Sequence, residues 1–310
     1  MSKVVLVGTG FVGMSFAYSA LNKGTFETLV LIDVNKEKAV GEAMDLNHGL
    51  VFAPRKMHIY AGDYGDCHDA DIVVITAGVN QKPGETRLDL LKRNAAIMKS
   101  VVKEVMASGF NGIFLVATNP VDILTYVVYE ASGLPKSKVI GSGTSLDTAR
   151  LRYEIAKRIH IDVRNVHAYI LGEHGDSEFV SWSNANVGSK PIMDVIETID
   201  TLKFEDLKVI EHDVRRAAYE IISRKQATYY GIGMALNRIV VAILNNENAI
   251  LPLSVLNEDE YDCDQVFIGL PAVVNKDGIH HIVKLKLTED EKALLKASSK
   301  ILKDAHIHLK

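Results

Sequence analysis

The sequence predicts an α/β fold, in which a doubly wound parallel sheet is followed by an α+β unit with antiparallel strands. In residues 1–141, short apolar runs alternate with stretches of helical spacing, and the runs are apolar on both faces. Such runs are typical of parallel strands buried between two layers of helices. In residues 142–310, the strand candidates follow one another with an alternating pattern, which is typical of antiparallel strands. We therefore expect two domains, residues 1–141 and residues 142–310.

The first half supplies six strand candidates and two long helical patterns. The strands are expected at Lys3–Val7, Thr28–Ile32, His58–Ala61, Asp71–Thr76, Gly112–Thr118 and Val139–Gly141. The helices are expected at Phe11–Lys23 and Arg87–Ser108. Strands that alternate with helices along the chain are joined by right-handed crossovers, so these six strands should form one parallel sheet.

The second half supplies both kinds of element in a different order. Helical patterns cover Ser145–Arg158, roughly Phe204–Asn245, and Glu289–Lys303. Strands are expected at Val166–Leu171, Leu251–Leu256, Gln265–Asn275 and Gly278–Leu287. The last three candidates are consecutive, which favours antiparallel pairing.

Composition and charge exclude several classes of protein. The chain has 310 residues, 47% of them hydrophobic, and a net charge of −4, which gives no support for a nucleic-acid partner. Its two cysteines cannot build a disulfide framework or a cysteine-rich metal site. No run of apolar residues is long enough to span a membrane, and the N-terminus lacks a signal-peptide layout. We therefore expect a cytoplasmic protein with no membrane association.

A glycine-rich turn follows the first expected strand. Its residues are Gly8, Thr9, Gly10, Phe11, Val12 and Gly13. The turn opens a helix, and Asp33 ends the next strand 20 residues after Gly13. This context is the dinucleotide-binding fingerprint of the Rossmann fold, in which the helix N-terminus receives the pyrophosphate. The Asp33 carboxylate suits ribose hydroxyls and would repel a 2′-phosphate, which favours NAD over NADP. The alternative is a structural glycine turn without a cofactor.

Two further motifs carry groups for acid–base chemistry. His174 lies between glycines and acids just after an expected strand, and a histidine has a suitable pKa for proton transfer near neutral pH. Asp147 and Arg150 are three residues apart and share a helix face. In one cleft, Asp147 would orient an imidazole and Arg150 would grip a carboxylate through two hydrogen bonds. The alternatives are an exposed loop histidine and an ordinary surface ion pair.

A loop follows the fourth expected strand and ends in an arginine. It runs from Asn80 to Arg87 and contains Pro83 and Gly84. Its position is the carboxyl edge of the sheet, where doubly wound folds bind ligands. Such a loop can close over a substrate and exclude water. The alternative is a solvated connection.

Taken together, these segments resemble the L-lactate/malate dehydrogenase family. The resemblance covers nearly the whole chain and is most specific in AGVNQKPGETRLDL, ATNPVDILTY, GSGTSLDTARLR and VHAYILGEHGDS. It implies that His174 is the catalytic acid/base, that Asp147 is its carboxylate partner and that Arg150 binds the substrate carboxylate. It also implies that Arg87 polarises the substrate carbonyl as a catalytic residue.

The resemblance further implies a substrate pocket and a cofactor site. Asn119 matches the residue that bonds the reacting oxygen near the nicotinamide, and Thr228 matches a threonine of the side-chain pocket. The expected NAD-contacting residues are Gly8, Gly10, Phe11, Val12, Gly13, Asp33, Thr76, Ala77, Gly78 and Asn119. No metal is expected, because the arginine and the imidazolium supply the electrophile. The remaining histidine clusters are expected to be solvated, and they comprise His280, His281, His306 and His308.

Gln81 bears on which 2-hydroxy acid is used. In malate dehydrogenases this loop position is typically arginine, which pairs with the second carboxylate of oxaloacetate. A neutral glutamine leaves such a carboxylate unpaired, which is costly in a closed site. The resemblance with Gln81 therefore favours pyruvate and L-lactate. The alternatives are malate dehydrogenase and a dehydrogenase for a bulkier 2-hydroxy acid.

A different class of alternative is a non-catalytic NAD-binding protein that senses redox state on the same fold. The set of four ionisable residues argues against it, because a sensor has no use for a proton donor beside a carboxylate clamp. That set is His174, Asp147, Arg150 and Arg87.

Arg152 and His167 match positions that bind fructose 1,6-bisphosphate between subunits in bacterial members of the family. The resemblance therefore implies activation by this ligand and self-association, with a homotetramer expected. His167 and Tyr169 alternate on an expected strand, so they should point the same way. The alternative is that Arg152 and His167 pair with acids at an interface.

Overall fold

The computed structural model describes residues 2–79, 84, 86–258, 260–307 and 309. Its largest sheet has the strand order β14-β13-β12-β6-β5-β4-β1-β2-β3. The strands of this sheet are β1 (Lys3–Val7), β2 (Thr28–Ile32), β3 (His58–Ala61), β4 (Ile72–Ile75), β5 (Ile113–Val116), β6 (Val139–Gly141), β12 (Ala249–Leu256), β13 (Phe267–Asn275) and β14 (Gly278–Ile282). Two smaller sheets contain β7 (Val166–His167), β8 (Ile170–Leu171), β9 (Phe179–Val180), β10 (Asn186–Val187) and β11 (Lys190–Pro191).

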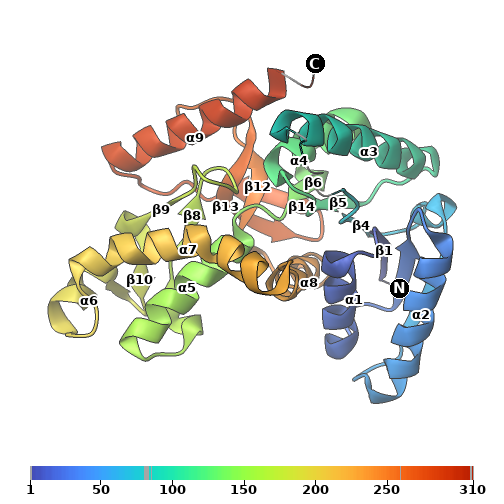
Figure 1. The fold of residues 1–310 in the computed structure, drawn as a ribbon, viewed down its shortest axis with the longest axis horizontal. Helices are drawn as coiled ribbons and strands as arrows, with labels where there is room; N and C mark the ends of the chain where they lie inside the picture. The colour runs from blue at the N-terminus through green and yellow to red at the C-terminus, as the bar shows by residue number, and fades with distance from the viewer. Residues whose placement is uncertain (1, 80–83, 85, 259, 308, 310) are drawn as a thin grey trace.

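The α-helices cover both faces of the large sheet (Figure 1). They are α1 (Phe11–Lys23), α2 (Lys36–His48), α3 (Arg87–Ala107), α4 (Val121–Ser132), α5 (Ser145–Ile159), α6 (Ile192–Thr198), α7 (Phe204–Lys225), α8 (Tyr230–Leu244) and α9 (Glu289–Ile307). The short 3-10 turns are η1 (Gly49–Phe52), η2 (Tyr64–Cys67), η3 (Lys136–Lys138), η4 (Val163–Asn165) and η5 (Trp182–Asn184). No helix among the described residues combines the length and the apolar character that crossing a membrane requires.

The six strands β1 to β6 form the parallel part of the sheet. Their order is β3-β2-β1-β4-β5-β6, and every neighbouring pair is parallel. This is the order of a doubly wound Rossmann sheet, in which the strand order reverses between β1 and β4. The predicted fold class is confirmed. Ligands bind such sheets at the carboxyl ends of the strands beside this reversal point.

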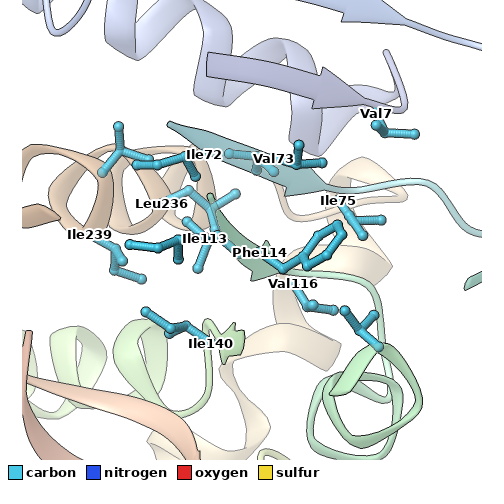
Figure 2. Packing of buried hydrophobic residues seen from close by; sticks show 14 of the residues in the cluster. Val7, Ile72, Val73, Ile75, Ile113, Phe114, Val116, Ile140, Leu236 and Ile239 are labelled. Carbon is cyan, nitrogen blue, oxygen red and sulfur yellow. The ribbon is translucent and has the colours of Figure 1, made fainter. Parts of the chain in front are cut away.

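The core of the sheet is apolar on both faces. The side chains of β4 and β5 lie with Leu236 and Ile239 of α8, and all of them are buried (Figure 2). Helix α8 also packs against α1, so a helix from the second half of the chain covers the cofactor half. Burial of large aliphatic side chains between layers is the main stabilising contribution to such a fold. It fixes the ends of β1, β4 and β5, where the site lies.

The antiparallel strands of the second half continue the same sheet. Strand β12 pairs with β6 through Ser254 and Gly141, and β13 and β14 follow in antiparallel register. The predicted antiparallel character of this region is confirmed. Ser254 thereby lies close to the carboxyl end of the parallel strands.

The helical pattern predicted at Phe204–Asn245 forms two helices instead of one. Gln226 adopts the left-handed conformation with φ 68°, and its N–H closes α7 on the carbonyl of Ile222. Helix α8 begins at Tyr230. The break places Thr228 in the connection between the two helices.

The single strand predicted at Val166–Leu171 is wrong. Strand β7 pairs with β10, whereas β8 pairs with β9 in another sheet. Between them, the carbonyl of Ala168 accepts a hydrogen bond from Arg152 Nε, and the carbonyl of Tyr169 accepts one from the N–H of Ser181. Ala168 and Tyr169 belong to neither strand, so His167 and Tyr169 do not alternate on one strand.

The predicted solvation of the histidine clusters is correct for one cluster and wrong for the other. His280 and His281 are exposed. His306 is buried, and its ring stacks on Tyr126 with centroids 4.2 Å apart, because α9 extends to Ile307 and lies against α4. His308 lies outside the described residues.

Candidate active site

The glycine-rich turn joins β1 to α1 at the edge of the sheet. Gly8 has φ +102°, and a Cβ there would lie 2.6 Å from the backbone nitrogen of Ala77. A Cβ on Gly13 would lie 2.2 Å from the carbonyl oxygen of Gly8. Both glycines are therefore required by the turn itself. Thr76 supports the turn by donating a hydrogen bond from its hydroxyl to the Gly8 carbonyl at 2.7 Å.

Gly10 is not required by packing. A Cβ on Gly10 would meet no heavy atom within 4 Å among the described residues. Gly10 is the N-cap of α1 and has no side chain that could accept a hydrogen bond from the helix. The first N–H groups of α1 therefore have no side-chain acceptor from the cap residue. A turn with this open space and a helix N-terminus fits the pyrophosphate of a dinucleotide.

Asp33 ends β2 directly beside this turn. One carboxylate oxygen accepts hydrogen bonds from the N–H and the hydroxyl of Thr9, both at 2.8 Å, and the other accepts one from the N–H of Asn35 at 2.9 Å. Burial alone would raise the pKa of Asp33, but these hydrogen bonds lower it below its ordinary value. The residue is therefore a fixed negative charge at the place where the fingerprint predicts the adenosine ribose.

The turns after β4 and β5 complete this edge of the sheet. Gly78 follows β4, and a Cβ there would lie 2.4 Å from the Thr118 methyl group, which follows β5. The carbonyl of Asn119 accepts a hydrogen bond from the Asn94 side chain at 3.3 Å, and Asn119 is exposed. Ala77 accepts a hydrogen bond from the Thr118 hydroxyl at 2.8 Å. The predicted cofactor-contacting turns are thus adjacent in space.

His174 and Asp147, which were predicted for catalysis, form one cluster with Arg150, which was predicted to bind the substrate carboxylate. Asp147 lies in the first turn of α5, and His174 lies in the loop after β8. One oxygen of Asp147 is 2.5 Å from His174 Nδ1, and the other accepts a hydrogen bond from Arg150 at 2.9 Å. Asp147 is buried, whereas Arg150 and His174 are half-buried. A buried carboxylate therefore fixes the orientation of both cations.

The electrostatics of this cluster favour a charged histidine. Burial alone would lower the pKa of His174, but the charge and hydrogen bond of Asp147 outweigh it and raise the pKa to about 9. Burial opposes ionisation of Asp147, yet His174 and Arg150 keep its pKa below its ordinary value. At neutral pH the pair is an imidazolium and a carboxylate. Because Nδ1 is held by Asp147, the proton on Nε2 is the one available to a ligand.

Asp122 supports the His174 loop, and the sequence analysis missed it. Asp122 lies in the first turn of α4, is buried, and accepts hydrogen bonds from the His174 N–H at 2.8 Å and the Ser254 hydroxyl at 2.6 Å. Burial raises the pKa of Asp122 to about 6 despite these bonds. The sequence feature that could have indicated Asp122 is an acidic residue at the start of a helix, directly after the Thr-Asn-Pro turn.

Glu178 is the second residue that the sequence analysis missed. It is 5% exposed, and a carboxyl oxygen lies within 4.8 Å of the nearest ligand atoms of Asp147 and His174. Among the described residues, this is the one group of acids and histidines close enough together to hold a metal ion. In this group one oxygen of Asp147 contacts His174 and the other accepts a hydrogen bond from Arg150. The sequence feature that could have indicated Glu178 is an acidic residue four positions after His174.

The predicted substrate loop is described at residues 84 and 86 and at the start of α3. Gln81 lies outside the described residues. Arg87 begins α3, whose N-terminus is capped by reciprocal hydrogen bonds between Thr86 and Asp89. Thr228 is half-buried between α7 and α8, and the adjacent Tyr229 ring stacks on Phe11 of the glycine turn at 5.2 Å. The segment that carries Thr228 therefore lies beside the cofactor turn.

Arg152 and His167 lie away from this cluster. Arg152 donates from Nε to the Ala168 carbonyl at 3.2 Å, and its guanidinium carbon lies 5.4 Å from the centre of the Tyr169 ring. Burial lowers the pKa of Arg152, although Tyr169 opposes the shift. His167 is exposed. Within the described part of the chain, neither residue forms an ion pair with a carboxylate.

Comparisons with known proteins agree with this architecture. Residues 2–141 match the model of the lactate/malate dehydrogenase NAD binding domain, and residues 144–308 match that of the lactate/malate dehydrogenase alpha/beta C-terminal domain. The chain belongs to the lactate/malate dehydrogenase family, which confirms the predicted resemblance and the NAD-binding domain.

Within the family, the chain is similar to proteins named L-lactate dehydrogenase. It is 56% identical over 304 residues to that of Geobacillus sp. (strain WCH70), covering 98% of this chain and 95% of the relative. A lactate dehydrogenase from a Medee basin deep-sea metagenome library superimposes with a TM-score of 0.99 at 70% identity, covering 99% of this chain and 98% of that one. The ligands-bound minor L-lactate dehydrogenase of Enterococcus mundtii gives a TM-score of 0.98 at 54% identity, covering 100% and 98%.

Proposed function

We propose that the chain is an NAD-dependent L-lactate dehydrogenase, which interconverts pyruvate, NADH and a proton with L-lactate and NAD. The observation that carries this proposal is the buried Asp147 carboxylate, which binds His174 on one oxygen and Arg150 on the other. This arrangement places a proton donor next to a carboxylate clamp. The names of relatives more than 50% identical support lactate as the substrate.

The cofactor would be held at the glycine turn and Asp33. Bound there, NADH would supply a hydride to C2 of the 2-oxo acid, and NAD would accept one from C2 of the 2-hydroxy acid. Arg150 binds the carboxylate of the 2-oxo acid through its guanidinium, and Arg87 stabilises the negative charge that develops on the carbonyl oxygen. His174 gives the proton on Nε2 to that oxygen, and Asp147 stabilises the imidazolium beforehand. In the reverse direction, neutral His174 accepts the proton from the lactate hydroxyl.

Gln81 sets the choice of acid in this proposal. An uncharged side chain at this position provides no partner for a second carboxylate, so pyruvate is favoured over oxaloacetate. The experiment is to measure kcat/KM with NADH for both acids. A higher value for pyruvate supports the proposal, and a higher value for oxaloacetate contradicts it in favour of malate dehydrogenase.

A regulatory role for Arg152 and His167 is part of the proposal. Neither side chain forms an ion pair with a carboxylate of the described residues, which leaves the Arg152 guanidinium and the exposed His167 ring available to the phosphates of fructose 1,6-bisphosphate. The expected assembly is a homotetramer, and a ligand that bridges subunits would stabilise it. Pyruvate kinetics at low substrate, with and without the bisphosphate, test activation, while sedimentation tests assembly. Unchanged kinetics contradict activation.

The cellular location in this proposal is the cytoplasm. Both cysteines, Cys67 and Cys263, are free thiols, which is typical of proteins in a reducing compartment. Fractionation of cells that produce the chain, with activity assayed in each fraction, tests this location.

A further inference from the structure

Glu178 is a buried acid beside the catalytic pair, and its backbone is fixed at two points. It directly precedes β9, its N–H donates to the Gly175 carbonyl at 3.2 Å, and its own carbonyl accepts a hydrogen bond from Arg215 at 2.9 Å. The backbone is therefore fixed beside the pair, and a carboxyl oxygen lies within the 4.8 Å group that contains Asp147 and His174. Its position is built into the loop that carries His174.

The Glu178 carboxyl group lacks a dedicated cationic partner. Within the described part of the chain, no group donates a hydrogen bond to its oxygens. Arg215 comes from α7 but pairs with Glu211 at 3.0 Å, and Arg150 is bonded to Asp147. A buried carboxyl group without such a partner favours its uncharged form.

The groups around Glu178 shift its pKa in opposite directions. Burial and the Asp147 carboxylate raise the pKa of Glu178, while His174, Arg150 and Arg215 oppose them, and the pKa is raised to about 9. Asp122 on α4 also raises the pKa of His174, and it accepts a hydrogen bond from the backbone N–H of His174. Glu178 and His174 therefore titrate in the same alkaline range, and each affects the other.

We propose that Glu178 is a positioning residue of the reaction, which adjusts the proton affinity of His174 as the pH rises. The proposal rests on the proposed role of His174 as the acid/base. When the carboxyl group ionises, a second negative charge lies beside the imidazolium and holds the proton on it. His174 then stays a proton donor to a higher pH, which favours pyruvate reduction and delays lactate oxidation.

The test is the pH profile of kcat/KM in both directions for Glu178→Gln. In this variant no charge appears at position 178, so the alkaline fall of pyruvate reduction should move to lower pH by about one unit. The alkaline rise of lactate oxidation should move by the same amount in the same direction. At a fixed pH near 8.5, reduction therefore falls while oxidation rises. Damage to the fold would lower both rates together.

Two further variants keep the experiment decisive. Glu178→Asp retains an acid but withdraws it by one methylene, so its profile should lie between those of the Gln variant and the unmodified chain. Glu291→Gln is the matched control, because Glu291 is also a buried glutamate but bonds to Ser183 away from the pair. Its profile should not move. If Glu178→Gln does not fold, a shift of the pH profile to lower pH in Glu178→Asp supports the inference, and an unchanged profile in that variant contradicts it.

The outcomes separate this inference from the proposed function. An unchanged profile in the Glu178 variants, with turnover abolished in His174→Asn while NADH still binds, overturns the role of Glu178 alone. Turnover that survives in His174→Asn overturns the acid/base role and this inference with it. A shift that appears equally in Glu291→Gln also overturns the inference, because it would not depend on the position of Glu178.

Discussion

His174 Nδ1 lies 2.5 Å from a carboxylate oxygen of Asp147, and this contact joins the loop after β8 to the first turn of α5. Because Asp147 is buried, its charge is poorly screened by solvent and acts strongly on the imidazole. The contact determines how the reaction depends on pH.

The first prediction is that the rate of pyruvate reduction is independent of pH near neutrality and falls above pH about 9. The reason is that His174 must be protonated to act as the proton donor, and its pKa is raised to about 9. Asp147→Asn removes the charge that raises this pKa. The fall should then begin at least one unit lower, and kcat/KM at pH 7 should drop roughly 10²-fold. The measurement is a pH profile of kcat/KM. Asp45→Asn, at an exposed aspartate, is the control, and a shift there would contradict the assignment.

The second prediction concerns Asp122, whose two oxygens accept from the His174 N–H and the Ser254 hydroxyl. In Asp122→Asn, one acceptor oxygen replaces two, and the negative charge that strengthens the hydrogen bond from the His174 N–H is lost. We expect the free energy of unfolding to fall by about 2 kcal/mol and kcat to fall because the His174 loop loosens. Urea unfolding and steady-state kinetics measure the two effects. Unchanged stability would show that the buried bonds do not hold the loop.

The helix spacing of Asp147 and Arg150 was enough to predict that they share a face, and their side chains are indeed bonded. The glycine turn and Asp33 were equally accessible from local pattern, because strand, turn and helix follow one another directly. Asp122 and Glu178 were not, since their contacts with His174 and its partner depend on how distant segments meet in space. Burial without a partner is a property of the packed structure and leaves no local pattern.

The error at Val166–Leu171 has a related cause. Alternation along a chain shows that residues are extended, but it does not show which sheet they join. Here the carbonyls of Ala168 and Tyr169, which lie between β7 and β8, accept hydrogen bonds from Arg152 and Ser181. The two short strands belong to different sheets. Tyr169 consequently lies near the Arg152 guanidinium, and its direction is independent of that of His167.

The third prediction contrasts two glycines of the same turn. Gly13→Ala would place a Cβ 2.2 Å from the Gly8 carbonyl oxygen, so the turn must shift. We expect a clear fall in Tm and weak NADH binding. Gly10→Ala meets no described heavy atom within 4 Å, and its φ of −75° suits alanine. This variant should keep its Tm and lose NADH affinity by at least about tenfold, because the methyl group takes space expected for the pyrophosphate.

Thermal unfolding and fluorescence titration with NADH measure the two properties separately. The prediction requires that Gly10→Ala changes affinity without changing Tm. Normal NADH affinity in that variant would place the pyrophosphate elsewhere and would remove Gly10 from the cofactor site.

The last prediction tests the choice of substrate. Gln81→Arg introduces a cation where the proposed pocket holds an uncharged side chain, so the second carboxylate of oxaloacetate gains a partner. The ratio of kcat/KM for oxaloacetate to that for pyruvate should rise by at least about 10²-fold, since a paired carboxylate in a closed site replaces an unpaired one. The change should raise the value for oxaloacetate and also lower that for pyruvate, whose methyl group would face the new charge.

Gln226→Arg, which adds the same charge at an exposed position between α7 and α8, is the control and should leave the ratio unchanged. A ratio that stays constant in Gln81→Arg would mean that residue 81 does not line the pocket, and that another residue distinguishes the two acids.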